Sequence, residues 1–176
     1  GELEVTKPGT LGTNSNLVVL TNLNEAGNVV NTNHKQSKND RANQLWHSDS
    51  SFKIIPAQAS ILSGKKIPTK GGNTDFVSMR VVYESLDKCT KDKVNKLEAI
   101  HHFAHSRSKI DSSMVSQIEL DKFPPVVHPM VKINPVNNKK AVYFGSHTKS
   151  IKNLDGDESS KLLKYLNDFI NNEDYI

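Results

Sequence analysis

Cysteine is almost absent from this sequence of 176 residues, which contains only Cys89. A single thiol excludes an internal disulfide and suits a reducing compartment, and Cys89 is more simply an ordinary small residue than a nucleophile. No apolar run approaches the ~20 residues that cross a membrane, and no signal peptide is recognisable. We therefore expect a cytoplasmic protein with no membrane partner.

Apolar and aromatic residues are also scarce, at 35% and 6% of the chain. The length is sufficient for one domain with a core, so we assign residues 1–176 to a single domain with a lean interior. The sequence begins at Gly1 without an initiator methionine and ends at Ile176 just after an expected helix. We therefore expect both ends to be cut from a longer protein.

A strong charge of either sign is missing as well. Lys and Arg number 23 and Asp and Glu number 19, which gives a formal net charge of +4. The lysines are scattered and form no basic stripe, so we do not expect nucleic acid as a partner. The charge favours only a mild attraction for anions. We expect a small molecule as the partner, with self-association left open.

Short apolar runs bounded by turn residues predict strands, with two hairpins joined by turns at 24–28 and 135–140. The predicted strands are 17–20, 29–30, 57–62, 126–133 and 141–144. Residues 31–43 are polar and predict a surface loop, either a solvated connector or a lid ordered by ligand. Residues 110–123 give no clear prediction.

Apolar residues at a helical spacing predict three helices. The first covers 79–86, the second carries Val94, Leu97 and Ile100, and the third follows the acidic residues 155–158 and presents Leu162, Leu163, Leu166, Phe169 and Ile170. Together with the strands, these helices predict a mostly β fold with peripheral helices, either a sandwich or a jelly roll.

Two histidines have a spacing that would let them share a metal on a helix, His101 and His105 at i and i+4. No glutamate lies between them in the pattern of zinc proteases, and the polar residues 106–109 that follow predict an exposed loop. We interpret these histidines as surface residues.

The strongest chemical signal is Trp46-His47-Ser48-Asp49. At the end of a strand, residues i and i+2 project from the same face, so the His47 ring and the Asp49 carboxylate would converge on one cation. A histidine and a carboxylate are two-thirds of the facial triad of non-heme Fe(II) oxygenases. The tripeptide alone is a weak signal, because seven histidines and 19 acidic residues make a chance occurrence easy.

Further segments follow this tripeptide in a characteristic order, and they strengthen the interpretation. They are Gly71-Gly72-Asn73-Thr74-Asp75-Phe76, His128-Pro129-Met130-Val131-Lys132 and Tyr143-Phe144-Gly145-Ser146-His147. Together with 46–52, they resemble the Fe(II)/alpha-ketoglutarate-dependent dioxygenases of the taurine dioxygenase and dichlorophenoxyacetate dioxygenase family. The resemblance covers most of the chain and is closer to the dichlorophenoxyacetate branch.

The resemblance implies a double-stranded β-helix, or jelly roll, that is incomplete here and lacks its C-terminal strands. It implies Fe(II) bound by His47 and Asp49 and alpha-ketoglutarate gripped by Thr74, which would otherwise be a plain strand residue. It also implies a substrate contacted by Asn43, Ser51 and His147, whose simpler interpretations are a loop asparagine, a strand serine and a rim histidine.

The chemistry implied by the resemblance is hydroxylation of a small, anionic organic substrate with O2, yielding succinate and CO2. Asn134 stands where the herbicide-degrading branch has a histidine, which argues against an aryloxyacetate substrate. Sulfonates such as taurine, sulfate esters and small carboxylates remain open.

The sequence also departs from the family. The distal iron-binding histidine and the arginine that pairs with alpha-ketoglutarate lie, in the family, beyond the helix that here ends near Ile170, and no matching segment occurs in this chain. We assign neither His128 nor His147 to the metal, and we expect this chain alone to be inactive. A non-catalytic jelly-roll binding module is the alternative, and a cupin-like isomerase or hydrolase leaves residues 71–76 unexplained.

Overall fold

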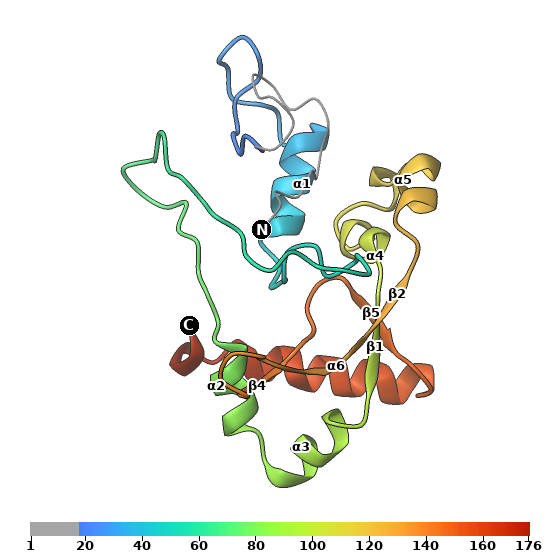
Figure 1. Ribbon diagram of the computed structural model, residues 1–176. Helices are drawn as coiled ribbons and strands as arrows, with labels where there is room; N and C mark the ends of the chain where they lie inside the picture. The colour runs from blue at the N-terminus through green and yellow to red at the C-terminus, as the bar shows by residue number, and fades with distance from the viewer. Residues whose placement is uncertain (1–17) are drawn as a thin grey trace.

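The computed structural model describes residues 18–176, and two small antiparallel sheets and one long helix organise it. The strands are β1 (Glu98–His101), β2 (Val126–Pro129), β3 (Val131–Ile133), β4 (Lys140–Val142) and β5 (Thr148–Ile151). The α-helices are α1 (Lys35–Asn43), α2 (Met79–Ser85), α3 (Lys88–Val94), α4 (Phe103–Ser108), α5 (Gln117–Lys122) and α6 (Gly156–Ile170). Two 3-10 helices, η1 (Ser112–Met114) and η2 (Glu173–Tyr175), complete the elements (Figure 1).

The larger sheet has the order β2-β1-β5, with β1 in the centre and antiparallel to both neighbours. Ala99 lies opposite His128 of β2 and Ile151 of β5. The register shifts between Ile100 and His101, so the strand is irregular where it approaches α4. The smaller sheet is the β3-β4 hairpin, in which Val131 pairs with Val142. A hairpin at this place was predicted from the sequence and is confirmed, but the single strand predicted at 126–133 is wrong, because it is divided at Met130 between the two sheets.

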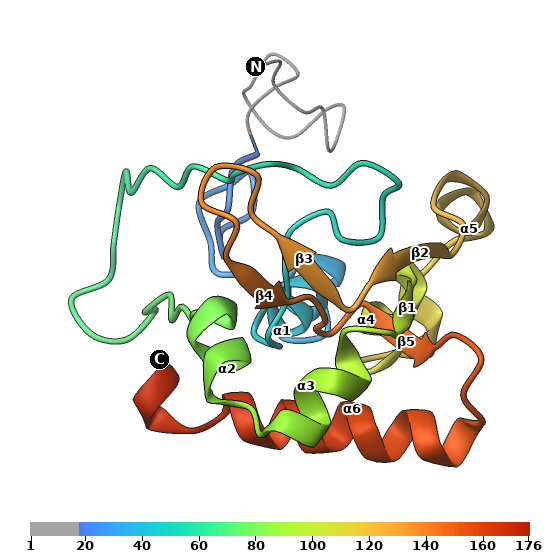
Figure 2. The ribbon, with the colours of Figure 1, turned by 60° about the horizontal axis from the view of Figure 1, so that its bottom comes forward.

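Helix α6 closes one side of the core, as Figure 2 shows. Leu162, Leu166 and Ile170 recur every four residues on one face and are buried, which is the pattern of an amphipathic helix. The Asp155 carboxylate accepts a hydrogen bond from the Glu158 amide and caps the first turn. The predicted third helix is therefore confirmed.

Helix α2 also agrees with the sequence prediction. The Ser78 hydroxyl caps its first turn, and Val82 and Leu86 are buried in the same core as α6. The helical spacing of apolar residues was sufficient to predict this helix, because α2 packs only one face against the core and leaves the other exposed.

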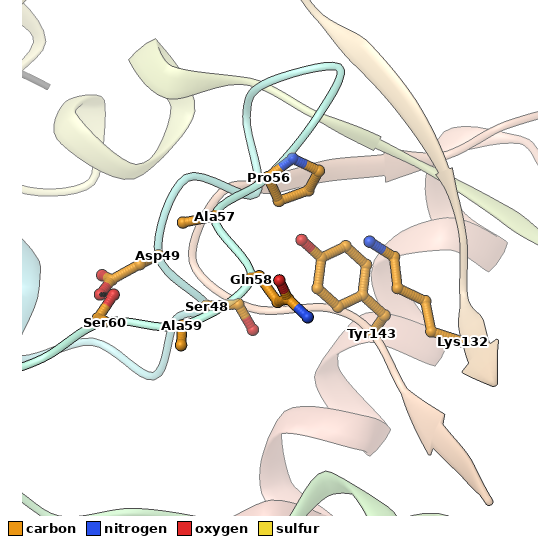
Figure 3. Close-up of a pocket in the computed structure, with 9 residues that line it drawn as sticks. All are labelled: Ser48, Asp49, Pro56, Ala57, Gln58, Ala59, Ser60, Lys132 and Tyr143. Atoms are coloured by element: carbon orange, nitrogen blue, oxygen red, sulfur yellow. Dashed lines mark hydrogen bonds between the residues drawn. The ribbon is translucent and has the colours of Figure 1, made fainter. Parts of the chain in front are cut away.

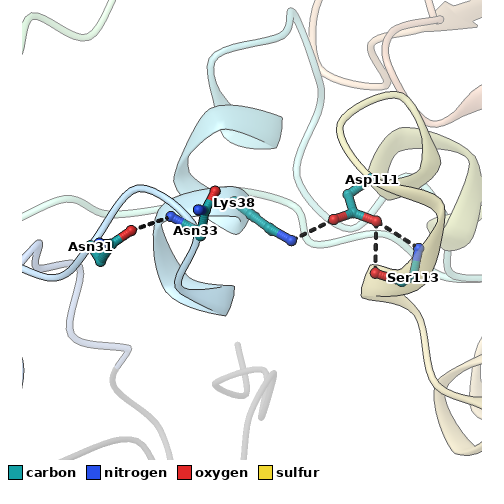
Figure 4. A network of polar contacts seen from close by, with 5 residues as sticks. All are labelled: Asn31, Asn33, Lys38, Asp111 and Ser113. Atoms are coloured by element: carbon teal, nitrogen blue, oxygen red, sulfur yellow. Dashed lines mark hydrogen bonds and ion pairs between the residues drawn. The ribbon is translucent and has the colours of Figure 1, made fainter.

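The predicted loop at 31–43 is wrong, because residues 35–43 form α1. Lys, Gln, Arg and Ala are good helix formers, so a polar composition does not exclude a helix. The His34 side chain caps the helix, and Lys38 forms an ion pair with Asp111, whose carboxylate also accepts from Ser113 (Figure 4). Tertiary contacts of this kind hold a polar helix in place.

The predicted second helix is too long. Helix α3 ends at Val94, and Ile100 lies in β1, because pairing with β2 and β5 satisfies the backbone of 98–101 in a sheet. The histidine prediction is wrong for the same reason, since His101 is 1% exposed in the central strand. Residues 106–108 belong to α4 and form no exposed loop.

Three other predicted strands are not present as such. Leu17 lies outside the described residues, residues 18–20 and 57–62 have no regular structure, and Val29 makes only an isolated bridge with Leu23 across the predicted turn. Among residues 18–176 the helices are longer than the strands, and the sheets do not close into a roll. The peripheral helices are thus present, whereas the mostly β composition expected from the sequence is not.

Candidate functional site

The segment that carries His47 and Asp49 follows α1 and has no regular structure at 46–48 and a turn at 49–52, so it is not the strand end that the sequence predicted. The connection from β4 to β5 holds it, because the Ser146 amide donates to the Trp46 carbonyl at 2.8 Å. A Cβ atom on Gly145 would lie 3.0 Å from that carbonyl oxygen and 3.1 Å from the His47 Cα. Only glycine permits this close approach without a shift of the backbone.

The two predicted metal ligands do converge. His47 Nε2 lies 3.3 Å from Asp49 Oδ1, and His47 Nδ1 lies 2.7 Å from the Leu45 carbonyl oxygen. A carbonyl only accepts, so Nδ1 carries a proton and the neutral ring presents a lone pair at Nε2. The other Asp49 oxygen accepts from the Ser60 hydroxyl at 2.5 Å.

The hydrogen bond to Asp49 raises the pKa of His47, although burial acts in the opposite direction. The same bond lowers the pKa of Asp49 to about 2. This hydrogen bond forms only when Nε2 is protonated. In the neutral tautomer, the Nε2 lone pair and the Asp49 oxygen face each other as two acceptors, so a cation between them stabilises the pair.

This arrangement fits a divalent metal ion. Two ligand atoms that bind one ion at right angles, each at about 2.1 Å, lie about 3 Å apart, close to the observed 3.3 Å. The contact from Nδ1–H to a backbone carbonyl is the usual support of a metal-binding histidine. Within residues 18–176, no group of three or more His, Cys, Asp or Glu side chains is placed to hold a metal ion, so His47 and Asp49 stand as a pair.

His147 lies directly beside this pair. Its ring centroid is 6.4 Å from that of His47 and 4.8 Å from that of Phe52, and its ring is stacked on Phe103 at 6.5 Å. Burial lowers the pKa of His147 to about 3, so the ring is neutral near pH 7. Its Nδ1 is buried without a hydrogen-bonding partner among the described residues.

The other predicted site residues lie in different environments. The Asn43 side-chain oxygen, at the end of α1, accepts from Arg107 Nη1 at 3.2 Å, and Ser51 is buried, 3% exposed. Thr74 is exposed in the long connection that precedes α2 (Figure 1). Gly71 and Gly72 before it have positive φ values. The structure thus groups His47, Asp49 and His147, and it leaves Thr74 apart from them.

A cavity of about 550 Å³ opens beside Asp49. Residues 56–60 form one wall, and Lys132 of β3 and Tyr143 after β4 form the opposite end (Figure 3). Pro56, Ala57 and Ala59 make that wall small and largely apolar, which is typical of sites for small organic molecules.

Sequence reasoning missed three residues of this region. Lys132 and Tyr143 stand in segments that carry the family resemblance, but nothing in the sequence shows that they meet across a cavity from Asp49. Arg107 was expected in an exposed loop, whereas its guanidinium is half-buried over Phe103, with a centroid distance of 5.1 Å. Its charge adds to the effect of burial in lowering the pKa of His147 and opposes the rise in the pKa of His47, so it lies near the pair.

No helix within residues 18–176 has the length and apolar character needed to cross a membrane.

A family model described as "Taurine catabolism dioxygenase TauD, TfdA family" matches residues 10–176. The chain is 32% identical over 150 residues to an alpha-ketoglutarate-dependent 2,4-dichlorophenoxyacetate dioxygenase of Burkholderia sp. (strain RASC), covering 85% of this chain and 50% of that protein. It is 33% identical over 147 residues to an (S)-phenoxypropionate/alpha-ketoglutarate-dioxygenase of Sphingobium herbicidovorans, covering 80% and 51%. The chain therefore spans about half the length of these relatives.

The fold is similar to a crystal structure of AAD-2 in complex with Mn(II) and N-oxalylglycine. The two share 33% sequence identity with a TM-score of 0.83, over 89% of this chain and 58% of the other. The similarity thus extends over most of this chain and over little more than half of the other.

Proposed function

Because this chain belongs to the taurine catabolism dioxygenase TauD, TfdA family, we propose that the whole protein is an Fe(II)- and alpha-ketoglutarate-dependent dioxygenase. It would hydroxylate a small, anionic organic substrate with O2 and form succinate and CO2. The observation that carries the proposal is the His47–Asp49 pair, whose facing nitrogen and oxygen lie 3.3 Å apart.

His47 Nε2 and Asp49 Oδ1 would hold the Fe(II), and the bound ion would supply the activation of O2 that no amino-acid side chain provides. The contact of Nδ1 with the Leu45 carbonyl keeps the ring in the metal-binding tautomer. The bond from Ser60 fixes the Asp49 carboxylate. These contacts set the orientation of both ligands before a metal arrives.

The remaining site residues are assigned by the family resemblance. Thr74 would bind alpha-ketoglutarate, which requires the connection before α2 to move toward the pair, since Thr74 is exposed here. Asn43, Ser51 and His147 would contact the substrate. Asn43 and His147 are supported by their neighbours, because Asn43 binds Arg107 and His147 lies beside His47.

In the whole protein, we propose that the two sheets are part of a double-stranded β-helix, and that residues 53–77 pair with strands of that roll. The similarity to AAD-2 supports this proposal. So does the exposure of large apolar side chains in this segment, since Ile55 and Ile61 are 84% and 92% exposed. We place the protein in the cytoplasm, which its single free cysteine supports.

Succinate formation tests the proposed function. The whole protein, supplied with Fe(II), ascorbate, O2 and alpha-ketoglutarate, should release succinate faster when a sulfonate, sulfate ester or carboxylate from a substrate panel is added. Asp49→Ala should abolish this release, whereas Asp92→Ala, which changes an exposed carboxylate of α3, should leave it unchanged. Release that is equal in wild type and Asp49→Ala would overturn the proposal.

A non-catalytic binding module of the same fold is the second candidate. The observation that favours it is that the described residues offer only two metal ligands. The same assay separates the two candidates, because a binding module would bind organic anions without forming succinate under any condition.

A further inference from the structure

The cavity beside Asp49 has two chemically different ends. Asp49 lies at one end, where a negative charge belongs to the proposed metal site, and Lys132 and Tyr143 lie at the other (Figure 3). In the metal-free protein, an organic anion entering this cavity would be repelled by the Asp49 carboxylate and attracted by the Lys132 ammonium. With a metal ion on Asp49 that repulsion disappears, and the Lys132 ammonium still attracts the anionic group to its own end of the cavity.

Lys132 lacks a counter-ion within residues 18–176. Its Nζ lies 3.6 Å from the centroid of the Tyr143 ring, a cation–π contact, and it makes no hydrogen bond or ion pair with another described residue. Burial lowers the pKa of Lys132, which shows that the ammonium is partly desolvated. A desolvated charge is unfavourable unless it is paired, and a bound anion would provide the missing partner.

Tyr143 offers a donor at the same end of the cavity. Its ring is stacked on His101 with centroids 5.3 Å apart and meets His128 edge-on at 5.6 Å, so its position is fixed by packing. Burial raises the pKa of Tyr143 to about 12, which keeps its O–H protonated at neutral pH. The hydroxyl has no partner among the described residues, so it is free to donate to an anion beside Lys132.

From this geometry we propose that Lys132 and the Tyr143 hydroxyl bind the anionic group of the primary substrate, with the reacting end directed toward Asp49. The ligand class is a small organic carboxylate or sulfonate. The inference rests on the proposed function, because it assigns the substrate end of the same site. The small apolar side chains of Pro56, Ala57 and Ala59 would line the uncharged part of the substrate.

Equilibrium binding tests the inference separately from catalysis. Hexanoate, 1-butanesulfonate and the neutral analogue hexanamide are titrated into the whole protein without added metal, and the dissociation constants are measured by calorimetry. Lys132→Met should weaken binding of both anions by about tenfold or more, the usual effect of losing a charged hydrogen-bond partner. Binding of hexanamide should not change.

Three further variants keep the test interpretable. Lys132→Arg retains the charge and should hold both anions within about threefold of wild type, and Tyr143→Phe retains the ring and should weaken them by about threefold to tenfold. Lys139→Met, an exposed lysine in the turn of the same hairpin, should have no effect. Circular dichroism of each variant verifies that it is folded.

The inference would be overturned if the wild-type protein bound neither anion. It would also be overturned if Lys132→Met and Lys139→Met had equal effects on anion binding, or if Lys132→Met weakened binding of the neutral analogue as much as that of the anions. The cosubstrate is an alternative source of the anion, so alpha-ketoglutarate is titrated in parallel. Loss of its binding in Lys132→Met, with the other anions unaffected, would assign the lysine to the cosubstrate and also overturn the inference. Failure of the proposed function would be separate, seen as no succinate formation while the anions still bind.

Discussion

At the scale of single residues, the geometry around His47 depends on Gly145. The β4–β5 connection passes so close to residues 46 and 47 that any side chain at position 145 would press on their backbone atoms. That contact, together with the hydrogen bond from Ser146 to Trp46, positions His47 in the absence of strand pairing.

Gly145→Ala should therefore destabilise the protein by about 1–3 kcal/mol, the usual effect of overpacking, and should weaken metal binding by displacing His47. Urea unfolding measures the first effect. Gly156→Ala is the matched control, because a Cβ there meets nothing within 4 Å. Equal stability of the two variants would contradict the role given to Gly145.

His101 should make the stability depend on pH. Burial lowers its folded-state pKa to about 3, below the ordinary value of 6.5. Between these values the unfolded chain binds a proton that the folded chain does not, so the free energy of unfolding falls as the pH decreases from about 6.5 toward 3. It is unaffected by this group above about pH 7. The slope from one such group is at most about 1.4 kcal/mol per pH unit.

His101→Phe keeps a ring against Tyr143 and removes the titrating group. Unfolding by urea at pH 4.5, 5.5 and 7.5 should show a shallower decrease for this variant than for wild type. An unchanged slope would show that His101 does not contribute to the acid sensitivity.

The sequence was sufficient to select residues with metal-binding side chains, but not to predict which residues surround them. The spacing of His47 and Asp49 was sufficient to predict that they converge. The burial of His101 depends on pairing with a strand whose residues are 25 or more positions away in the sequence. The contact of Lys132 with Tyr143 depends on which side of the hairpin faces the cavity. No local pattern encodes such contacts.

At the scale of elements, α6 packs against β5 of the three-stranded sheet β2-β1-β5. Leu166 is fully buried near the middle of its apolar face, and the Ser159 hydroxyl accepts a hydrogen bond from the Ile151 amide of β5 at 2.8 Å. The helix therefore fixes the strand that immediately follows His147.

Leu166→Ala should lower the free energy of unfolding by about 2–5 kcal/mol, because it removes buried methyl groups and leaves a cavity. Tyr165→Ala, at a neighbouring position that is 43% exposed, should change it by less than about 1 kcal/mol. Urea unfolding monitored by circular dichroism compares the two, and similar losses would mean that α6 does not form the core face assigned to it.

Helices and strands were predicted correctly where the sequence carries a local signal, and incorrectly where contacts with distant residues determine the structure. Helices α2 and α6 and the β3–β4 hairpin have local signals of apolar spacing or turn residues. Helix α1 was missed because its stability comes from the cap at His34 and the ion pair of Lys38 with Asp111. Strand β1 was missed because its residues also fit a helical spacing, and only pairing with β2 and β5 selects the sheet.

At the scale of the whole molecule, the proposed metal site consists of two side chains, because no group of three or more metal-binding side chains occurs within residues 18–176. A facial triad has three protein ligands. The chain spans about half the length of its relatives. A coordination sphere with only two protein ligands would bind a metal weakly.

We therefore predict that the 176-residue chain alone, given Fe(II), ascorbate and alpha-ketoglutarate, releases little or no succinate. The whole protein should release it under the same conditions. Succinate measured by chromatography compares the two, and equal rates would show that the described residues are sufficient for catalysis.

The account depends most directly on whether His47 and Asp49 share one metal ion. The decisive measurement is Fe(II) binding to the whole protein by anaerobic equilibrium dialysis. We predict one bound ion in wild type and in Asp92→Ala, and affinity reduced by about tenfold or more in His47→Ala and in Asp49→Ala. Unchanged affinity in either of the last two variants would contradict the metal site and the dioxygenase function built on it.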